Sequence, residues 1–188
     1  MFNARSIVNK IAELHHLLYV DTYDLYFVTE TWLHDGVCSG LLDPNSEFDV
    51  LRKDRTGGRG GGVCVFARKH LRIMPVVFDD EFLDIEMFCF DLISTDNRVR
   101  FFVLYRPPSL DNHAINYIRL LIKCLSRYES VKQTNVLLGD LNLPQINWHT
   151  NVGLQFTTMY THCSCHMLSR VVIVNLSIFL LVILVSLM

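Results

Sequence analysis

The segment at residues 135–148, NVLLGDLNLPQINW, combines a short apolar run with polar side chains at its exit. The run VLL at 136–138 is typical of a strand buried on both faces, and Gly139 removes a side chain where the backbone turns or is closely approached. Asp140 and Asn142 follow, and carboxylate and amide oxygens at a strand end suit a hard cation or a phosphate ester. We therefore expect Asp140 and Asn142 to belong to a reactive site.

Groups of the same kind stand beside other predicted elements. Asn3 precedes the first predicted helix, Glu30 follows a strand in VTETWL, and Tyr105 ends the strand FFVLY. Carboxylates from separate strands can share a magnesium ion, which prefers oxygen ligands and keeps positions for water and substrate. Any one of these residues has an ordinary alternative as a capping or turn residue, but agreement among four element ends favours one shared site.

The elements that must position these groups alternate along the chain. Helices are predicted at 6–19, where Ser6 can cap the first turn, and at 111–128, because apolar residues recur on one face of each. The predicted strands are residues 25–29, 48–52, 62–67, 72–77, 85–92, 99–105 and 135–139. Strands dominate and helices cover them, which favours an α/β layered sandwich with mixed sheets over a doubly wound sheet.

Composition limits the class of protein only loosely. The 188 residues, 51% of them hydrophobic, suffice for one domain with a core. Residues 1–150 carry 16 Lys or Arg against 19 Asp or Glu, so the overall charge gives no support for nucleic-acid binding. Residues 52–72 hold seven basic residues and one acid, which fits either a phosphate-binding segment or a solvated face. Six scattered cysteines without a visible signal peptide favour a reducing compartment with free thiols.

The last residues differ in kind from the rest. Residues 171–188, VVIVNLSIFLLVILVSLM, contain no ionisable side chain. A helix of this length reaches about 27 Å, just short of a hydrocarbon core of about 30 Å. One alternative is a transmembrane helix that anchors the chain at a membrane; the favoured one is a hydrophobic end on a truncated or frame-altered chain. In either case we expect a helix that packs little against residues 1–150.

Five segments together carry a resemblance: NARSIVNKIAEL, TETWL, RGGGVCVFARKHL, VLYRPPS and LLGDLNLPQINW. In order and spacing they resemble the endonuclease domain of non-LTR retrotransposons, a branch of the endonuclease, exonuclease and phosphatase superfamily. The resemblance covers residues 2–148 and implies a four-layer α/β sandwich of two mixed β-sheets flanked by helices. It also implies a phosphodiester hydrolase that uses Mg²⁺ or Mn²⁺ to nick DNA, in the nucleus or cytoplasm. No protein partner is expected.

The resemblance implies a role for each residue that matches a motif. Glu30 looks like the metal-binding glutamate, and Asn3 like the asparagine that helps to hold the metal and the phosphate. Tyr105 is similar to the phosphate-contacting tyrosine. Asp140 is similar to the aspartate that orients or activates the attacking water, and Asn142 to its partner asparagine.

The chain departs from the family pattern at both ends. The late Ser-Asp-His motif of the family has no match, and no acid follows Asp140. Only two residues precede Asn3, where the family has a full first strand. We therefore expect residues 1–150 to form an incomplete domain that cleaves DNA poorly or not at all, and residues 151–188 to lie outside the family. The alternative is a non-catalytic retrotransposon remnant, held at a membrane by its tail. The late histidines are His149, His162 and His166.

The glycine-rich segment RTGGRGGG lacks the Gly-Lys-Ser/Thr sequence of a P-loop. We interpret residues 57–62 as a flexible turn that leads into a strand. Arg55, Arg59 and Arg68 become candidate contacts to the DNA backbone only because the resemblance makes DNA the expected substrate. Trp32 and Trp148 are interpreted as residues that close the core beside the motifs rather than as residues that stack on bases.

Overall fold

The structure is a computed structural model that describes residues 1–108, 112–142 and 171–175. Its helices are α1 (Ile11–Val20), α2 (Ser39–Leu42), the short 3₁₀ helix η1 (Asp80–Phe82) and α3 (Asn112–Tyr128). Its strands are β1 (Phe2–Asn3), β2 (Leu25–Thr29), β3 (Phe48–Lys53), β4 (Val63–Arg68), β5 (Arg72–Val76), β6 (Met87–Ile93), β7 (Arg98–Tyr105), β8 (Thr134–Asp140) and β9 (Val171–Asn175). Most strands thus lie within one or two residues of the ranges predicted from the sequence.

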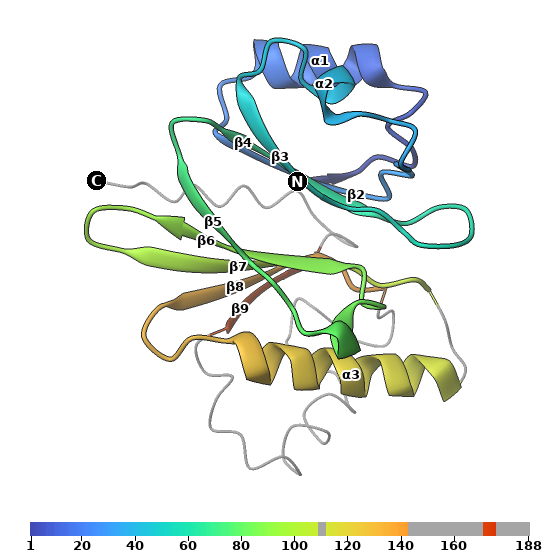
Figure 1. The fold of residues 1–188 in the computed structure, drawn as a ribbon, viewed down its shortest axis with the longest axis vertical. Coiled ribbons are helices and arrows are strands. Elements are labelled where there is room, and N and C mark those ends of the chain that lie inside the picture. The colour runs from blue at the N-terminus through green and yellow to red at the C-terminus, as the bar shows by residue number, and fades with distance from the viewer. Residues whose placement is uncertain (109–111, 143–170, 176–188) are drawn as a thin grey trace.

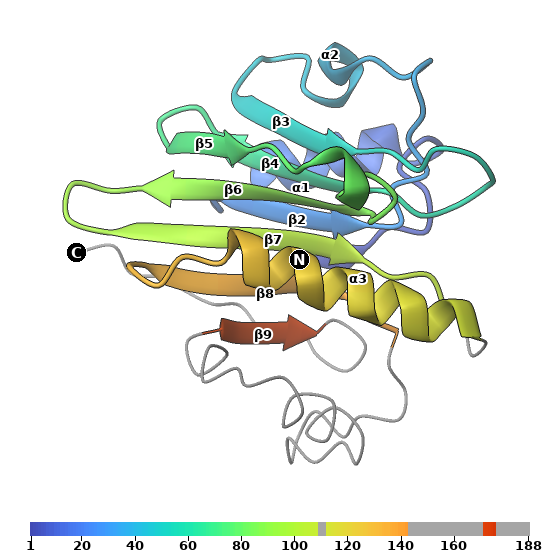
Figure 2. The same ribbon diagram turned by 60° about the horizontal axis from the view of Figure 1, so that its bottom comes forward.

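Two mixed sheets form the middle of the molecule. The first has the order β1-β2-β4-β3, with β1 and β2 parallel, and the second has the order β5-β6-β7-β8-β9, with β7, β8 and β9 parallel. Helices α1 and α2 cover the outer face of the first sheet, and α3 covers the outer face of the second (Figure 1). The turned view shows α3 running along β7 and β8 (Figure 2). The predicted four-layer sandwich of mixed sheets is confirmed.

Alternating side chains place three apolar cores between these layers. In β4, Val63 and Val65 point into the core between the sheets, whereas Cys64 and Phe66 point toward α1. All four are fully buried, as expected for a strand covered on both faces. Phe27 of the first sheet meets the second sheet there, with its ring centroid 5.7 Å from that of Phe101. The third core lies between the second sheet and α3.

The first helix begins later than the sequence predicts. Residues 6–10 are excluded from α1, and Ser6 has a φ of 87°, outside the helical range. The reason is a competing set of hydrogen bonds: the Ser6 N–H donates to the Glu30 carbonyl at 2.8 Å, and the Ile7 N–H donates to the Thr31 carbonyl at 2.8 Å. Ser6 therefore ties the chain to the segment after β2 instead of capping a helix.

The helix predicted at 171–188 is wrong for its first residues. Val171–Asn175 form β9, which pairs in parallel with β8 from Asn135 to Gly139. A continuous apolar run fits a strand buried in a parallel sheet as well as a helix, and β-branched valines favour the strand. Within the described residues, no helix combines the length and apolar character that membrane crossing needs. Residues 176–188 lie outside the described part.

A buried ionic cluster links the strands of the second sheet. The Asp91 carboxylate has no exposed side-chain surface and accepts hydrogen bonds from Arg98, from Arg100 at 2.8 Å and from Gln133 at 3.0 Å. Arg100 also donates to the Tyr128 carbonyl at the end of α3. Burial raises the pKa of Asp91, but the two guanidinium groups outweigh burial and hold that pKa below its ordinary value. Asp91 is therefore ionised and structural.

We predict that Asp91→Asn lowers the free energy of unfolding by about 2 to 3 kcal/mol. This is less than the roughly 3 to 5 kcal/mol of breaking a fully buried pair, because both guanidinium groups keep some contact with water. Urea denaturation of the variant measures the change, with Asp49→Asn as the control, since Asp49 is exposed on β3. Equal stability of the two variants would show that the cluster contributes little.

Candidate active site

The predicted site residues meet where parallel strands of both sheets end. β1 and β2 end at Asn3 and Thr29, and β7 and β8 end at Tyr105 and Asp140. Two hydrogen bonds join these ends across the gap between the sheets. The Tyr105 hydroxyl donates to Glu30 Oε1 at 3.2 Å, and Asn3 Nδ2 donates to Asp140 Oδ2 at 3.3 Å. One site therefore contains side chains that lie up to 137 positions apart in the sequence.

Glu30 is held in an uncommon backbone conformation. Its φ is 51°, in the left-handed region, which costs a non-glycine residue about 1 to 3 kcal/mol. The chain segments on both sides hold it there, through the bonds from Ser6 and Ile7 and through the Trp32 N–H, which donates to the Gly61 carbonyl at 3.0 Å. In this backbone conformation the Glu30 carboxylate points toward Tyr105, at the end of the sandwich.

Asp140 lies in a turn that a buried arginine fixes. The Arg106 N–H donates to the Asp140 carbonyl at 2.8 Å, and Arg106 Nη1 donates to the Asn142 carbonyl at 2.7 Å. The Asn142 N–H donates to Asp140 Oδ1 at 3.3 Å, and Asn142 Nδ2 donates to the Arg106 carbonyl at 2.6 Å. Asn142 thus lies beside Asp140 as predicted, and its amide nitrogen holds the turn in place.

Gly139 explains how Asp140 comes so close to Tyr105. An added Cβ at Gly139 would lie 1.9 Å from the Leu104 carbonyl oxygen, closer than atoms can approach. The sequence-based expectation of a close approach at Gly139 is therefore correct, and the approaching group is the neighbouring strand. Because Gly139 has no side chain, β7 and β8 can stay paired up to their last residues, Tyr105 and Asp140.

The environment of Tyr105 keeps its hydroxyl protonated. Burial is the main reason that its pKa rises to about 12, and the negative charge of Glu30 and its hydrogen bond add to the rise. Asp140 acts in the same direction, whereas the nearby Arg55 opposes it. At neutral pH, Tyr105 is therefore a hydrogen-bond donor aimed at anionic oxygens.

The sequence analysis missed Glu86. This buried carboxylate accepts from Arg55 Nε at 2.6 Å through Oε1 and from the Gly62 N–H at 2.7 Å through Oε2, and its carbonyl accepts from the Tyr105 N–H at 2.9 Å. The Arg55 guanidinium in turn lies 5.6 Å from the centroid of the Tyr105 ring. One feature of the sequence could have identified Glu86: it is an acid between Ile85 and Met87, inside an apolar stretch predicted to be a strand.

The glycine-rich segment is more constrained than a flexible turn. Gly61 and Gly62 have φ values of 70° and 82°. An added Cβ would lie 2.3 Å from Glu86 Oε2 at Gly61 and 2.6 Å from Thr31 Oγ1 at Gly62. These glycines are needed because the backbone packs directly against the Glu86 carboxylate and the segment that follows β2.

The oxygen donors at the site fit a magnesium ion. Glu30 and Asp140 supply carboxylates, and Asn3 supplies an amide oxygen that already accepts the Arg5 N–H at 3.1 Å. Magnesium sites with one or two carboxylates are common, because water and substrate phosphate complete the octahedron. In residues 1–108, 112–142 and 171–175, no cluster of three or more His, Cys, Asp or Glu side chains is placed to hold a metal.

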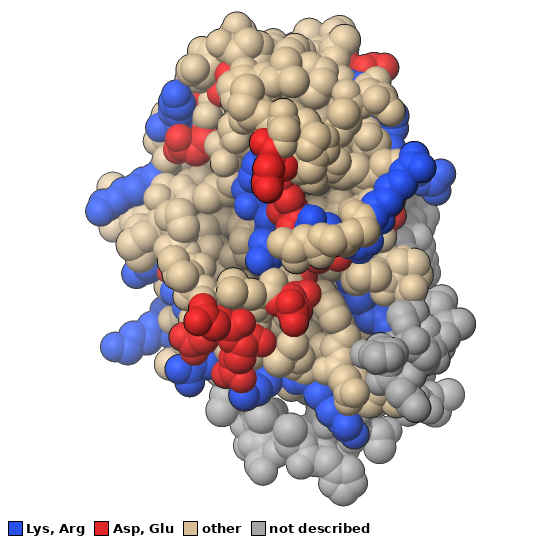
Figure 3. Space-filling view, turned by 45° about the vertical axis from the view of Figure 1, so that its right-hand side comes forward, with Lys and Arg blue, Asp and Glu red and all other residues tan. Residues whose placement is uncertain are grey.

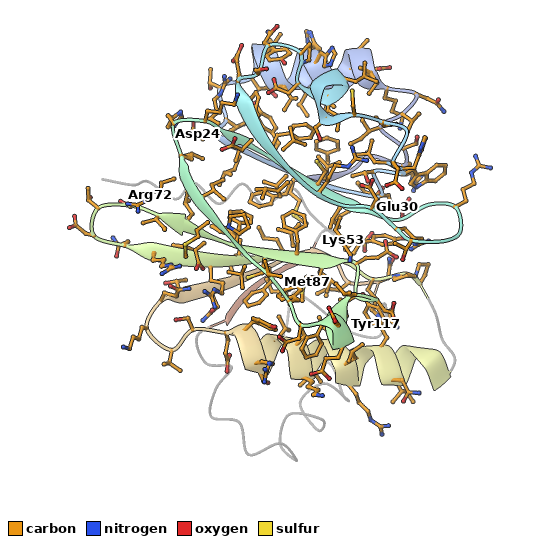
Figure 4. All side chains as sticks on the ribbon, in the orientation of Figure 1. Asp24, Glu30, Lys53, Arg72, Met87 and Tyr117 are labelled. Carbon is orange, nitrogen blue, oxygen red and sulfur yellow. The ribbon has the colours of Figure 1, made fainter. Side chains whose placement is uncertain are left out.

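Charges of both signs share one face of the molecule. Figure 3 shows Lys and Arg interspersed with Asp and Glu over the middle of one face, with a group of acids below them. Figure 4 labels Glu30 at one end of the sandwich and Asp24 and Arg72 at the opposite end. Residues at that opposite end therefore serve as controls for substitutions at the site. His149, His162, His166 and Trp148 lie outside the described residues.

We predict that Glu30→Gln lowers the pKa of Tyr105 from about 12 toward its ordinary value. A neutral amide removes the negative charge that disfavours the tyrosinate, so the sign of the change is fixed. Titration of ¹³C-labelled tyrosine by NMR measures it, and Tyr105→Phe identifies the signal. Glu13→Gln, an exposed change on α1, is the control. An unchanged Tyr105 pKa in Glu30→Gln would contradict the contact.

Comparison with known proteins finds structures that share the fold but no close relative in sequence. No protein-family model matches the chain, and no curated protein matches its sequence. A 3′ phosphatase from Neisseria, solved bound to a product DNA hairpin, matches with a TM-score of 0.56 and 16% identity over 77% of this chain and 57% of its own. An AP endonuclease from Archaeoglobus fulgidus matches with a TM-score of 0.56 and 14% identity over 77% and 56%.

The endonuclease domain of TRAS1, a telomere-specific non-LTR retrotransposon, matches with a TM-score of 0.53 and 12% identity over 75% of this chain and 57% of that one. The chain therefore spans little more than half the length of each of these structures. At such low identities the likeness concerns the fold, and it agrees with the resemblance drawn from the motifs. The chain therefore shares its fold with this phosphatase and these two endonucleases.

Proposed function

We propose that this chain is a divalent-metal-dependent phosphodiester hydrolase domain that acts on DNA, as the endonuclease domain of a non-LTR retrotransposon. The observation that carries the proposal is the pair of hydrogen bonds that join Tyr105 to Glu30 and Asn3 to Asp140. They gather two carboxylates, an amide and a phenol from both sheets at one point. Packing alone gives no reason to place such groups together at the ends of buried strands.

Glu30 and Asn3 would hold Mg²⁺ or Mn²⁺ through their oxygens. The ion, when bound, supplies a Lewis acid for the phosphate oxygens. Arg55, which lies over the Tyr105 ring, supplies further positive charge near the phosphate. Tyr105 donates its hydroxyl hydrogen, now bonded to Glu30, to a non-bridging phosphate oxygen, and its raised pKa keeps that hydrogen in place.

Asp140 would prepare the attacking water. Its carboxylate accepts hydrogen bonds from Asn3 Nδ2 and from the Asn142 N–H, which fix its orientation. A carboxylate held in this way can accept a hydrogen bond from water and draw its oxygen into line with the phosphorus. Asn142 acts by holding the turn through the Arg106 carbonyl.

Three observations outside the site favour DNA as the substrate. The Neisseria phosphatase of the same fold is bound to a product DNA hairpin, and the TRAS1 domain belongs to a retrotransposon. The motif set of residues 2–148 resembles the retrotransposon branch in order and spacing. Together they support DNA as the substrate and a retrotransposon as the source.

We predict that the protein binds Mn²⁺ and that Glu30→Gln weakens this binding at least about tenfold. Even an outer partner of a metal ligand is commonly worth about 10- to 100-fold in affinity, and a charged ligand contributes at least as much. Titration followed by the electron paramagnetic resonance of free Mn²⁺ measures the affinity without any reaction. Asp24→Asn, at the opposite end of the sandwich, is the control. Equal affinities in the two variants would place the metal elsewhere.

We further predict slow, magnesium-dependent nicking of supercoiled plasmid by residues 1–188. The rate is low because no acid follows Asp140 to pair with a late histidine, as the resemblance implies for the full reaction. Asp140→Asn should reduce the remaining rate by about 10²- to 10⁴-fold, the usual contribution of a positioned acid or base. Asp49→Asn is the control. Nicking that survives in Asp140→Asn would refute this assignment, and metal binding without nicking would favour the non-catalytic remnant.

A further inference from the structure

A pocket of about 420 Å³ opens beside the candidate active site. It lies between the segment that precedes α1 and the glycine-rich turn that joins β3 to β4. Its walls include apolar side chains, Val8 and Leu33, and polar ones, Asn9 and Arg59. Its volume is in the range of about 300 to 1,000 Å³ that small-molecule sites occupy.

The pocket shares residues with the site that binds phosphate in the proposed function. Arg55 lines the pocket and also lies over the Tyr105 ring, 5.6 Å from its centroid. Trp32, another wall, stands two residues after Glu30 and is tied to Gly61 by its N–H. Through Arg55 and the segment that follows Glu30, the pocket therefore adjoins the candidate active site.

The walls suit a flat aromatic ligand. The Arg59 guanidinium lies 5.2 Å from the Trp32 ring centroid, and Arg59 is exposed and forms no ion pair with an acid in the described part of the chain. Trp32 Nε1 is buried and finds no hydrogen-bond acceptor among the described residues. Guanidinium and indole planes are surfaces on which bases stack, and stacking tolerates every base because each has a π face.

We infer that this pocket is a subsite for one unstacked base of the DNA strand whose phosphate occupies the candidate active site. The inference rests on the proposed function and deepens it. The base stacks on the surface made by Arg59 and Trp32, while Arg55 remains with Glu86 and the phosphate. Trp32 is then a binding residue as well as part of the core.

The test compares two single-stranded oligonucleotides of equal length and charge, one with thymine bases and one abasic throughout. Binding is measured with EDTA present, so that no cleavage occurs. The chain has two tryptophans, so Trp148→Phe leaves Trp32 as the only one, and its fluorescence reports directly on the pocket. We expect the base-containing strand to quench Trp32 and to bind about tenfold more tightly than the abasic strand. Fluorescence anisotropy of labelled strands repeats the comparison with the unsubstituted chain.

Arg59→Ala should abolish the preference for bases, and it is expected to fold because Arg59 is exposed. Arg72→Ala, which removes the same charge at the opposite end of the sandwich, should keep the preference. Equal binding of the two strands, or equal behaviour of the two variants, would overturn the base subsite. That result would leave the proposed function intact, because nicking by the Asp140 series tests the proposed function separately. Failure to bind either strand would also overturn the subsite, and the nicking assay would still decide whether DNA is the substrate.

Discussion

The packing of the inner faces of the two sheets is the constraint on which the site depends. Val63 and Val65 of one sheet share a core with Phe101 and Val103 of the other, and Tyr105 continues the same row. A shift of one residue in β7 would turn this row to the opposite face. The register that buries Phe101 and Val103 is therefore the register that points the Tyr105 hydroxyl at Glu30. The apolar core and the position of the reactive groups are set by the same alternation.

This placement has a cost in stability at the end of the sandwich. Glu30 is strained, Glu86 is a buried acid, and Gly61 has a positive φ where its backbone meets that acid. Each feature is compensated locally: Glu86 is satisfied by Arg55 and by the Gly62 N–H, and hydrogen bonds on both sides hold Glu30. A folded chain has no need of such an arrangement for stability, since well-packed apolar groups would serve as well. Its presence is more consistent with a site than with a core.

The sequence predicts what depends on local pattern and misses what depends on competition between distant segments. Alternating apolar residues give β4 and β7, and Asp140 follows directly because it is polar at the end of such a strand. Ser6 could not be assigned correctly, since its N–H bonds to Glu30, whose position depends on the folded sheets. Glu86 was taken as part of a strand because its partners, Arg55 and Gly62, lie far from it in the sequence. At 171–175 the periodicity of an apolar run does not separate helix from strand; the β-branched valines favour the strand, and the edge of β8 supplies its partner.

The role of the basic segment at 52–72 depends on the side chains with which its basic residues pair. As a sequence it looks like one surface for a phosphate backbone, but Arg52 pairs with Asp54, Arg55 with Glu86 and Arg68 with Glu47. These pairs neutralise much of the charge, so a continuous electrostatic track is not what the segment provides. Any contact of this segment with a nucleic acid then depends on where single guanidinium groups lie. Arg55 stands beside Tyr105 and is paired with the Glu86 carboxylate, whereas Arg59 stands over Trp32 and has no carboxylate partner within the described residues. Glu86 therefore holds the Arg55 guanidinium in place, whereas the Arg59 guanidinium is positioned by its contact with the Trp32 ring.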